Sequence, residues 1–366
     1  MVIFTFSLII AYFLTHLFLR YGLDKSVSLK TVNPSPNNKV TIIVAARNEE
    51  KIIGQCITSL KQLTYNKENL EIFLVNDKST DATKEIMLKE TSGHSFFKVI
   101  DSRPESSTNL KGKANALDTA IMQSSGEIII GTDADCKVNK EWVQEVVKYY
   151  DKDTAMVCGV TYINSSNSVF YKVQALDWVY LQTLASASSG INMTLSCIGN
   201  NLSFRKSVYE ELGGYGNIPF SVTEDLALMQ EIHSKGYKIK YPINENSIVE
   251  THACKSLDEL FKQKRRWFRG GLKINILGLL LGLEMYPVNL ILITGWFFLS
   301  WEIYFLFILI KIFSEVILIS KPMRTYKFTY LYTYFVHFQL FFAFYGLTLP
   351  WTFLFNTKIQ WKDRKF

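Results

Sequence analysis

Two strongly apolar stretches, one at each end of the chain, place the tightest limit on what this sequence can fold into. Val2 to Leu19 is almost wholly apolar and long enough to cross a bilayer, which takes about 20 helical residues. Arg20 and Lys25 follow it, whereas a signal peptide carries its positive charge before the apolar run and a cleavage site after it. We therefore expect an uncleaved anchor over residues 1–23, with the next domain in the cytoplasm of the cell.

The second apolar stretch covers residues 274–356, and we expect two to three transmembrane helices there. Three helices would place the basic cluster at 321–327 inside and the basic tail at 357–366 outside, and two would reverse this, so the count stays open. Lys311 and Glu315 lie four residues apart inside this stretch, a spacing that predicts an ion pair on one helix face.

Composition and charge exclude some classes of partner. Hydrophobic residues make up 48% of the 366 residues, which is high for a purely soluble protein. The net charge of +7 is modest, and the basic residues gather locally at 262–269 without the long stripe that a nucleic-acid-binding surface needs. We expect no nucleic-acid partner and read this cluster as facing membrane lipids. Five scattered cysteines without a Cys-x-x-Cys pair indicate neither a zinc site nor a disulfide framework.

The middle of the chain, residues 39–256, reads as strands that alternate with helices. Strands that are apolar throughout and joined by helices predict an α/β fold with a mainly parallel sheet flanked by helices. Residues 24–38 are the expected linker from the anchor, and 257–273 an interfacial amphipathic helix. The predicted strands are Val40–Ala45, Glu71–Val75, Phe97–Ile100, Glu127–Gly131 and Ala155–Ile163, and the predicted helices are Glu49–Leu63, one from about Thr80, and Lys113–Ser124.

Carboxylates follow two of these strands. Asp133 and Asp135 come on alternate residues directly after a buried strand, where they can share a hard cation such as Mg²⁺ or Mn²⁺ with substrate phosphates. Asp77 ends the second strand and can accept hydrogen bonds from a base or ribose, although a helix cap would explain Asp77 or Asp81 equally well. Ligands of parallel sheets bind beyond the carboxyl ends of the strands, which favours the binding interpretation.

Lys113, Glu224 and Asp225 can each be interpreted either as an ordinary helix-end residue or as a functional residue. Lys113 opens a helix, where a cation and a helix N-terminus both favour an anion, but it can equally be a solvated lysine. Glu224 and Asp225 begin another helix after Thr223, and acidic residues there are ordinary dipole partners. Asp225 becomes a candidate general base only together with the other acidic residues.

The basic segment near the second apolar stretch contains Gln263, Arg266 and Trp267 on the expected amphipathic helix. An arginine fork suits phosphate oxygens, and an indole can stack on a sugar. Gly199-Asn200-Asn201 is a weak candidate for a turn that brings backbone close to a ligand. His252 is interpreted as an ordinary histidine rather than a metal ligand.

The order of these motifs resembles the inverting family-2 glycosyltransferases, in particular the membrane-bound branch with ceramide glucosyltransferases and the cellulose, chitin and hyaluronan synthases. The resemblance runs from about Val40 to Gly271. It implies a GT-A-like fold, a UDP-sugar donor, a lipid or glycan acceptor and a divalent cation. The loop Asn76-Asp77-Lys78 departs from the paired aspartates of many relatives, so Asp77 alone must serve.

By position, the resemblance implies a role for each motif. The segment with Ala45 and Glu49 lines the nucleotide pocket, Asp77 reads the uracil, Lys113 meets the donor phosphates and Asp133 lies beside the nucleotide sugar. Asp135 is the metal ligand and Asp225 the base. Glu224, Gln263, Arg266 and Trp267 lie at the acceptor and the diphosphate.

The expected function is therefore metal-dependent, inverting transfer of a sugar to a lipid or lipid-linked acceptor at the cytosolic membrane face, giving a β-glycoside. A short-polysaccharide synthase of the same fold is an alternative. A nucleotidyltransferase would need a basic, glycine-rich loop after the first strand, and the loop at 46–50 is acidic and lacks glycine. A non-catalytic scaffold predicts the loss of at least one acidic position, and all are present.

Overall fold

The computed structural model describes residues 1–33, 38–105, 109–164, 167–271, 275–355, 360–361 and 364–365. It contains two compact units. One is the α/β unit, formed by Leu29–Tyr162 and Ser196–His252. The other is the helical unit, formed by Met1–Ser28, Ile163–Leu195 and Ala253–Phe366. Parts of the expected linker, of the segment after Gly271 and of the basic tail lie outside the described residues.

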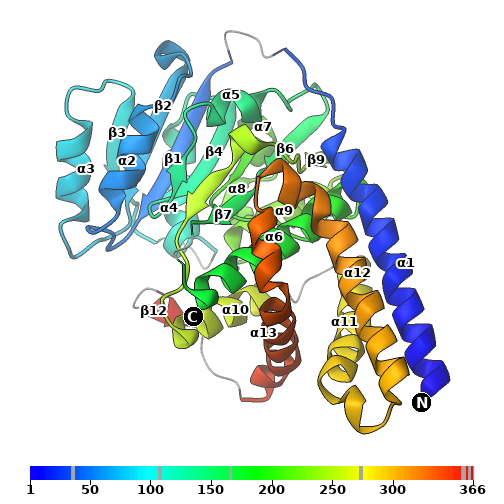
Figure 1. Ribbon diagram of the computed structural model, residues 1–366. Helices are drawn as coiled ribbons and strands as arrows, with labels where there is room; N and C mark the ends of the chain where they lie inside the picture. Colours follow the sequence, from blue (N-terminus) through cyan, green and yellow to red (C-terminus); the bar gives the residue numbers. More distant parts are fainter. Residues whose placement is uncertain are drawn as a thin grey trace. The chain divides into compact units, whose positions relative to one another are not determined.

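The α/β unit is built on a seven-stranded sheet with the order β3-β2-β1-β4-β8-β6-β9, and Figure 1 shows the first four strands next to one another. β1, β2, β3 and β4 pair in parallel, as predicted, whereas β8 runs antiparallel to both neighbours and β6 pairs parallel with β9. The strands are β1 Val40–Ala46, β2 Leu70–Asn76, β3 Phe97–Asp101, β4 Ile128–Asp133, β6 Thr154–Cys158, β8 Leu202–Arg205 and β9 Lys238–Lys240.

Helices cover both faces of this sheet, which explains why its central strands are apolar without alternation. Val40, Ile42 and Val44 of β1 pack into a core with α2, α3 and α5, and α4 packs against β1 and β2. The helices of this unit are α2 Ile53–Lys61, α3 Thr83–Thr91, α4 Gly112–Gln123, α5 Trp142–Val147, α7 Lys206–Glu211, α8 Gly214–Asn217 and α9 Glu224–Ser234.

Two helices begin later than the sequence predicts. α2 begins at Ile53 rather than Glu49, and α3 at Thr83 rather than about Thr80. In both places side chains hold the backbone in a loop: Thr83 Oγ1 accepts from Glu49 N at 2.7 Å, and Asn48 Oδ1 accepts from Thr80 N at 2.8 Å. The loops after β1 and β2 are thus tied to each other before either helix starts.

The predicted strand Ala155–Ile163 is wrong as a single element. It divides into β6 and β7 (Thr161–Ile163), and β7 joins β5 (Lys137–Val138) and β10 (Val249–Thr251) in a small second sheet with the order β5-β10-β7. The chain leaves the first sheet at Gly159, whose N–H donates to Asn201 O at 2.7 Å, and Val160 O accepts from Val249 N at 3.1 Å. The apolar pattern of residues 155–163 does not show that the chain passes from one sheet to the other here.

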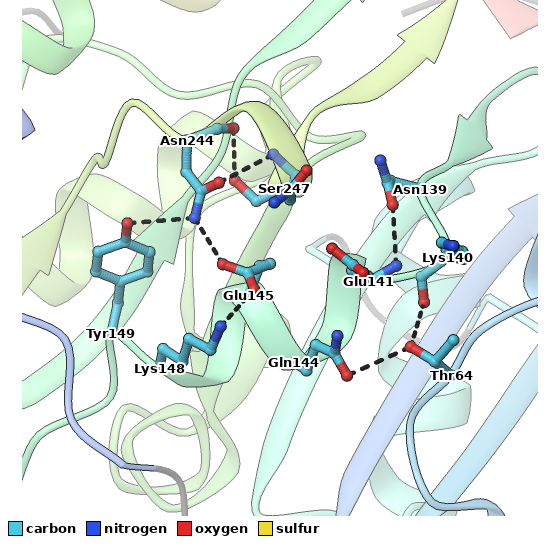
Figure 2. A network of polar contacts seen from close by, with 11 residues as sticks. Thr64, Asn139, Lys140, Glu141, Gln144, Glu145, Lys148, Tyr149, Asn244 and Ser247 are labelled. Atoms are coloured by element: carbon cyan, nitrogen blue, oxygen red, sulfur yellow. Dashed lines mark hydrogen bonds and ion pairs between the residues drawn. The ribbon is translucent and has the colours of Figure 1, made fainter. Parts of the chain in front are cut away.

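A polar network ties α5 to the short helix η2 (Glu245–Ser247), as Figure 2 shows. Asn244 Nδ2 donates to Glu145 Oε2 at 2.9 Å and to Tyr149 Oη at 3.4 Å. At the start of α5, Asn139 Oδ1 accepts from Glu141 N at 3.0 Å. Ser247 Oγ donates to Asn244 O at 3.2 Å, which ties Ser247 to this network. The carbonyl oxygen of Ser247 in turn accepts a hydrogen bond from Asn201 Nδ2.

In the part of the chain that the structure describes, the helical unit contains three helices that are long and apolar enough to cross a membrane: Val2–Val27, Ile276–Phe297 and Trp301–Thr325. Within the described residues, two of these three lie after Gly271; α13 (Phe335–Thr348) is shorter than a bilayer span. The remaining helices are α6 Val169–Gly190 and α10 Leu257–Gly270, while α11 is Ile276–Thr294 and α12 Trp301–Thr325. Figure 1 shows α1 (Val2–Val27) beside α12.

A buried polar cluster joins these helices. Lys311 Nζ donates to Glu315 Oε1 at 2.6 Å, which confirms the predicted pair, and Tyr12 Oη donates to the same carboxylate at 2.5 Å. Gln339 of α13 completes the cluster through hydrogen bonds with both Lys311 and Glu315. Because every charge is partnered, the cluster links α1, α12 and α13 without leaving an unpaired ion among apolar helices.

Candidate active site

The carboxyl ends of β2, β1 and β4 lie next to one another in the sheet. Register pairs Ala45 of β1 with Val75 of β2 on one side and with Asp133 of β4 on the other. Asp77 follows β2 directly, and Asp135 follows β4. The candidate donor-binding residues therefore leave adjacent strands at the same edge, where ligands of parallel sheets bind.

Asp77 is 2% exposed and held by its surroundings. Its N–H donates to Ala46 O at 2.8 Å, and Arg47 Nη1 donates to its carbonyl at 3.1 Å. Ser102 Oγ, just beyond β3, donates to Asp77 Oδ1 at 3.2 Å. Ser102 was not singled out in the sequence, because a lone serine after a strand carries no distinctive pattern.

Lys113 links two of the predicted acidic residues. Its Nζ lies 2.6 Å from Asp133 Oδ1 and 3.1 Å from Glu224 Oε1. Burial alone would lower the pKa of Lys113, but the charges of Asp133 and Glu224 outweigh it and raise the pKa well above its ordinary value. The ammonium therefore stays charged and joins the start of α4 to the end of β4 and the start of α9.

Asp225 lies at the N-terminus of α9, where its Oδ1 accepts from Leu226 N at 2.9 Å. Thr223 is the N-cap residue, as predicted, although its side chain does not cap the helix. Tyr215 lies close by: its burial, followed by the charges of Glu224 and Asp225, raises its pKa well above the ordinary value, so the phenol stays neutral. The sequence did not predict that Tyr215 lies near Asp225, because no local pattern connects α8 with α9.

The acidic residues fit a cation that takes part of its shell from a substrate. Asp133 and Asp135 are half-buried, and the charges of Asp133, Glu224 and Asp225 act on the partly buried ammonium of Lys113. Within the described ranges there is no group of three or more His, Cys, Asp or Glu residues that could hold a metal by themselves, and this includes the surroundings of His252. Mg²⁺ and Mn²⁺ sites with one or two carboxylates and substrate phosphates match this donor set.

Gln263, Arg266 and Trp267 belong to the helical unit, on α10. Gln263 Oε1 is buried and has no hydrogen-bond partner in the part of the chain that the structure describes. An orphaned buried acceptor costs free energy unless a donor reaches it, so this oxygen is suited to a ligand. The Trp267 ring lies 5.5 Å from that of Trp178, which belongs to α6 of the same unit.

Sequence reasoning missed the residue that holds this helix in place. Lys264 is buried and forms an ion pair with the fully buried Asp177 of α6, whose other oxygen accepts from Tyr345 Oη of α13. The Lys264 ammonium also lies 4.7 Å from the centroid of the Trp267 ring and 4.9 Å from that of Tyr345. We refer to Lys264, Asp177 and Tyr345 as the α10 lock. A lone aspartate in the apolar run of α6 was the one available signal.

Comparison with known proteins identifies the family. The model of Glycosyl transferase family 2 matches residues 41–213, and that of Glycosyl transferase family group 2 matches residues 128–355. Because the second match covers more than half of the chain, the protein belongs to this glycosyltransferase family. This membership decides against the nucleotidyltransferase alternative.

Among curated proteins, the chain is 26% identical to the probable glycosyltransferase YdaM of Bacillus subtilis (strain 168) over 324 residues, 86% of this chain and 75% of that protein. It is 28% identical over 263 residues to the poly-beta-1,6-N-acetyl-D-glucosamine synthase of Staphylococcus aureus (strain COL). That match covers 69% of this chain and 58% of the synthase, so the chain spans little more than half of that relative.

Among solved structures, the chain resembles the mannosyltransferase PcManGT from Pyrobaculum calidifontis in complex with GDP-Man and Mn²⁺. The TM-score is 0.63 at 17% identity, and the match covers 97% of this chain and 99% of that one. This likeness confirms the predicted GT-A-like α/β fold with a mostly parallel sheet and additional apolar helices.

Proposed function

We propose that this glycosyltransferase is a metal-dependent, inverting enzyme that transfers a sugar from a UDP-sugar to a hydroxyl of a lipid or lipid-linked acceptor at the cytosolic face of a membrane. The observation that carries the proposal is the contact of Lys113 with both Asp133 and Glu224. It joins the pair of aspartates after β4 to the start of α9, where Asp225 lies. Lys113, Asp133 and Glu224 thus form one connected cluster, and the charge of the candidate base, Asp225, also acts on Lys113.

Each candidate residue has a chemical task in this proposal. Asp77 accepts a hydrogen bond from the base of the donor, and its burial and the hydrogen bond from Ser102 hold its carboxylate in one orientation. Asp225 accepts the proton of the acceptor hydroxyl as that oxygen attacks the anomeric carbon. The bond from the anomeric carbon to the phosphate oxygen breaks on the opposite face, UDP departs, and the configuration inverts. Lys113 supplies a permanent positive charge beside the departing diphosphate.

Asp135, with Asp133, would hold the divalent cation. When bound, Mg²⁺ or Mn²⁺ neutralises charge that develops on the diphosphate. Two carboxylates would suffice, because substrate phosphates supply the other oxygen ligands at many Mg²⁺ sites. PcManGT, whose structure contains Mn²⁺, supports this assignment by its fold.

The helical unit supplies the membrane side of the proposal. Among its described residues, three helices are long and apolar enough to span a bilayer. On α10, the buried Gln263 Oε1 can accept a hydrogen bond from an acceptor hydroxyl, and Arg266 and Trp267 lie about one helical turn further along. These residues are assigned to the acceptor and the diphosphate.

The test uses the full chain in membranes or detergent, a panel of UDP- and GDP-sugars, a lipid extract and MnCl₂ or MgCl₂. We expect UDP release from one UDP-sugar, loss of that release with EDTA, and a lipid product of one added sugar by mass spectrometry. Asp225→Asn should lower turnover by about a hundredfold or more while UDP binding is kept, since a positioned general base contributes about 10²–10⁴-fold. Wild-type turnover in Asp225→Asn, or no consumption of any nucleotide sugar, would contradict the proposal.

A second candidate function is synthesis of a polysaccharide. The likeness to the poly-beta-1,6-N-acetyl-D-glucosamine synthase favours it, although the chain spans only 58% of that protein. The same assay distinguishes the two functions, because a synthase gives a ladder of products from UDP-N-acetylglucosamine rather than one sugar on one lipid.

A further inference from the structure

The turn Gly199-Asn200-Asn201 packs directly against the candidate base. A Cβ atom added to Gly199 would lie 2.9 Å from Asp225 Oδ2, 3.2 Å from its Cγ and 3.3 Å from its Cβ. Real Cβ atoms essentially never approach a neighbour more closely than 3.0 Å. Gly199 does not have a positive φ, so the backbone conformation itself would tolerate alanine. The requirement for glycine here comes from the space that Asp225 occupies.

The backbone on the C-terminal side of Gly199 is held by two buried asparagines. Asn200 Oδ1 accepts from Thr161 Oγ1 at 2.7 Å. Asn201 Nδ2 donates to Val160 O at 2.8 Å and to Ser247 O at 2.9 Å. Its Oδ1 accepts from Trp142 Nε1 at 3.0 Å, so all three of these Asn201 contacts are made inside the core.

Two further glycines show how closely the surrounding backbone packs. A Cβ on Gly159 would lie 2.5 Å from the Asn201 amide group, so no side chain fits there beside it. A Cβ on Gly131 of β4 would lie 3.5 Å from Gly199 O, an ordinary van der Waals distance. Gly199 therefore lies between β4 and Asp225 of α9, and the hydrogen bonds of Asn200 and Asn201 hold the backbone that follows it.

We propose that Gly199 is a positioning residue for the base: its missing side chain leaves the space in which the Asp225 carboxylate lies, and the Asn200–Asn201 support keeps that space at a constant distance from β4. This inference rests on the proposed role of Asp225. A methyl group at position 199 turns the carboxylate away, because an aspartate carboxylate can rotate about its own side-chain bonds, whereas the 199–201 backbone can move only together with the buried asparagines. The fold is unchanged, but the Asp225 carboxylate no longer lies where it can accept the proton of the acceptor hydroxyl.

The consequence for catalysis is large relative to the size of the change. A general base acts only within hydrogen-bond reach of the proton that it takes, and a misplacement of about 1 Å can cost about a hundredfold in rate. We expect Gly199→Ala to lower kcat by about 10- to 100-fold. Binding of the donor nucleotide should stay unchanged, because Asp77, Lys113 and Asp135 are not displaced.

The experiment compares Gly199→Ala with Gly54→Ala in the full chain. Gly54 lies in α2 of the same unit, has no positive φ, and an added Cβ would meet nothing within 4 Å. Three measurements are made: binding of UDP with MnCl₂ by calorimetry, turnover of the nucleotide sugar that the wild type consumes, and a crystal structure of Gly199→Ala. Both glycine variants are also placed in an Asp225→Asn background.

We expect Gly54→Ala to behave as the wild type in every measurement. Gly199→Ala should bind UDP normally, turn over slowly and show a rotated Asp225 carboxylate with the 199–201 backbone in place. In the Asp225→Asn background it should cause no additional loss, because the group through which it acts is already gone. An unmoved carboxylate, wild-type turnover, or an equal loss in both backgrounds would overturn the inference.

Failure of the proposed function has a different outcome. If Asp225→Asn alone keeps wild-type turnover, Asp225 is not the base, and the crystal structure still decides whether position 199 controls the place of its carboxylate.

Discussion

The α10 lock gives a prediction whose size can be worked out from the structure. Lys264→Met removes the cation that pairs with Asp177. Among the described residues, the hydroxyl of Tyr345 is then the remaining hydrogen-bond partner of this fully buried carboxylate. Breaking a buried ion pair by removing one partner costs about 3–5 kcal/mol. At about 2–4 °C per kcal/mol for a unit of this size, the apparent Tm of the purified protein in detergent should fall by roughly 6–20 °C.

The same helix provides a matched control. Lys262 pairs with Asp258 at 2.7 Å, but their side chains are 63% and 75% exposed. Exposed pairs contribute about 0–1 kcal/mol, so Lys262→Met should change the apparent Tm by little more than the error of measurement. Both variants remove one lysine from α10. The Lys264 pair is buried and joins two helices beside aromatic rings, whereas the Lys262 pair is exposed and lies within α10.

A double variant separates the ion pair from packing. In Lys264→Met/Asp177→Asn no buried charge is left unpaired, and the new amide oxygen can still accept from Tyr345 Oη, so this variant should be more stable than Lys264→Met alone. Thermal denaturation followed by far-ultraviolet circular dichroism measures the wild type and these three variants. Equal losses of stability in Lys264→Met and Lys262→Met would show that burial of the Lys264–Asp177 pair does not matter. A double variant less stable than Lys264→Met would show that the unpaired carboxylate is not the cause of the loss.

Three further outcomes are expected. Lys113→Met should weaken UDP binding about tenfold or more in calorimetry, because it removes a charge-assisted contact and leaves Glu224 without its 3.1 Å partner; unchanged affinity would argue against a role at the diphosphate. Asp135→Asn should raise the MnCl₂ concentration for half-maximal UDP release about tenfold or more, whereas the exposed Asp153→Asn should not. Burial raises the pKa of Asp151, but hydrogen bonds from Lys240 and Thr154 outweigh this and hold it well below its ordinary value. The ionised Asp151 therefore stabilises the fold above about pH 4, and this contribution is lost as the pH falls further. Asp151→Asn should lower the free energy of unfolding at pH 7, measured with urea, and make it fall less steeply below pH 4. An unchanged decrease below pH 4 would contradict the assignment.

Several elements of the fold could be predicted because their signals are local. The apolar run at Val2–Leu19 and the four parallel strands follow from hydrophobic length and from strands that are apolar on both faces. Strand ends could be located to within about two residues, so the aspartates at 77, 133 and 135 were recognised as lying at one edge of the sheet. Asn48 and Thr80 show the limit: the helices after β1 and β2 begin late because each loop bonds to the other, which neither local sequence reveals.

The sequence by itself therefore determined the class of fold, the apolar segments and the kinds of residue at the strand ends, because periodicity and strand-end position are properties of neighbouring residues. The tertiary structure alone decided which of these groups meet. Lys113 contacts Glu224 across the unit, and Gly199 lies against Asp225. Lys264 reaches Asp177 across 87 positions of the chain, and Tyr345 reaches it across 168. The physical reason is that burying an ion or a carboxylate depends on a partner arriving from another element, and only the packing of the folded chain specifies which element supplies it.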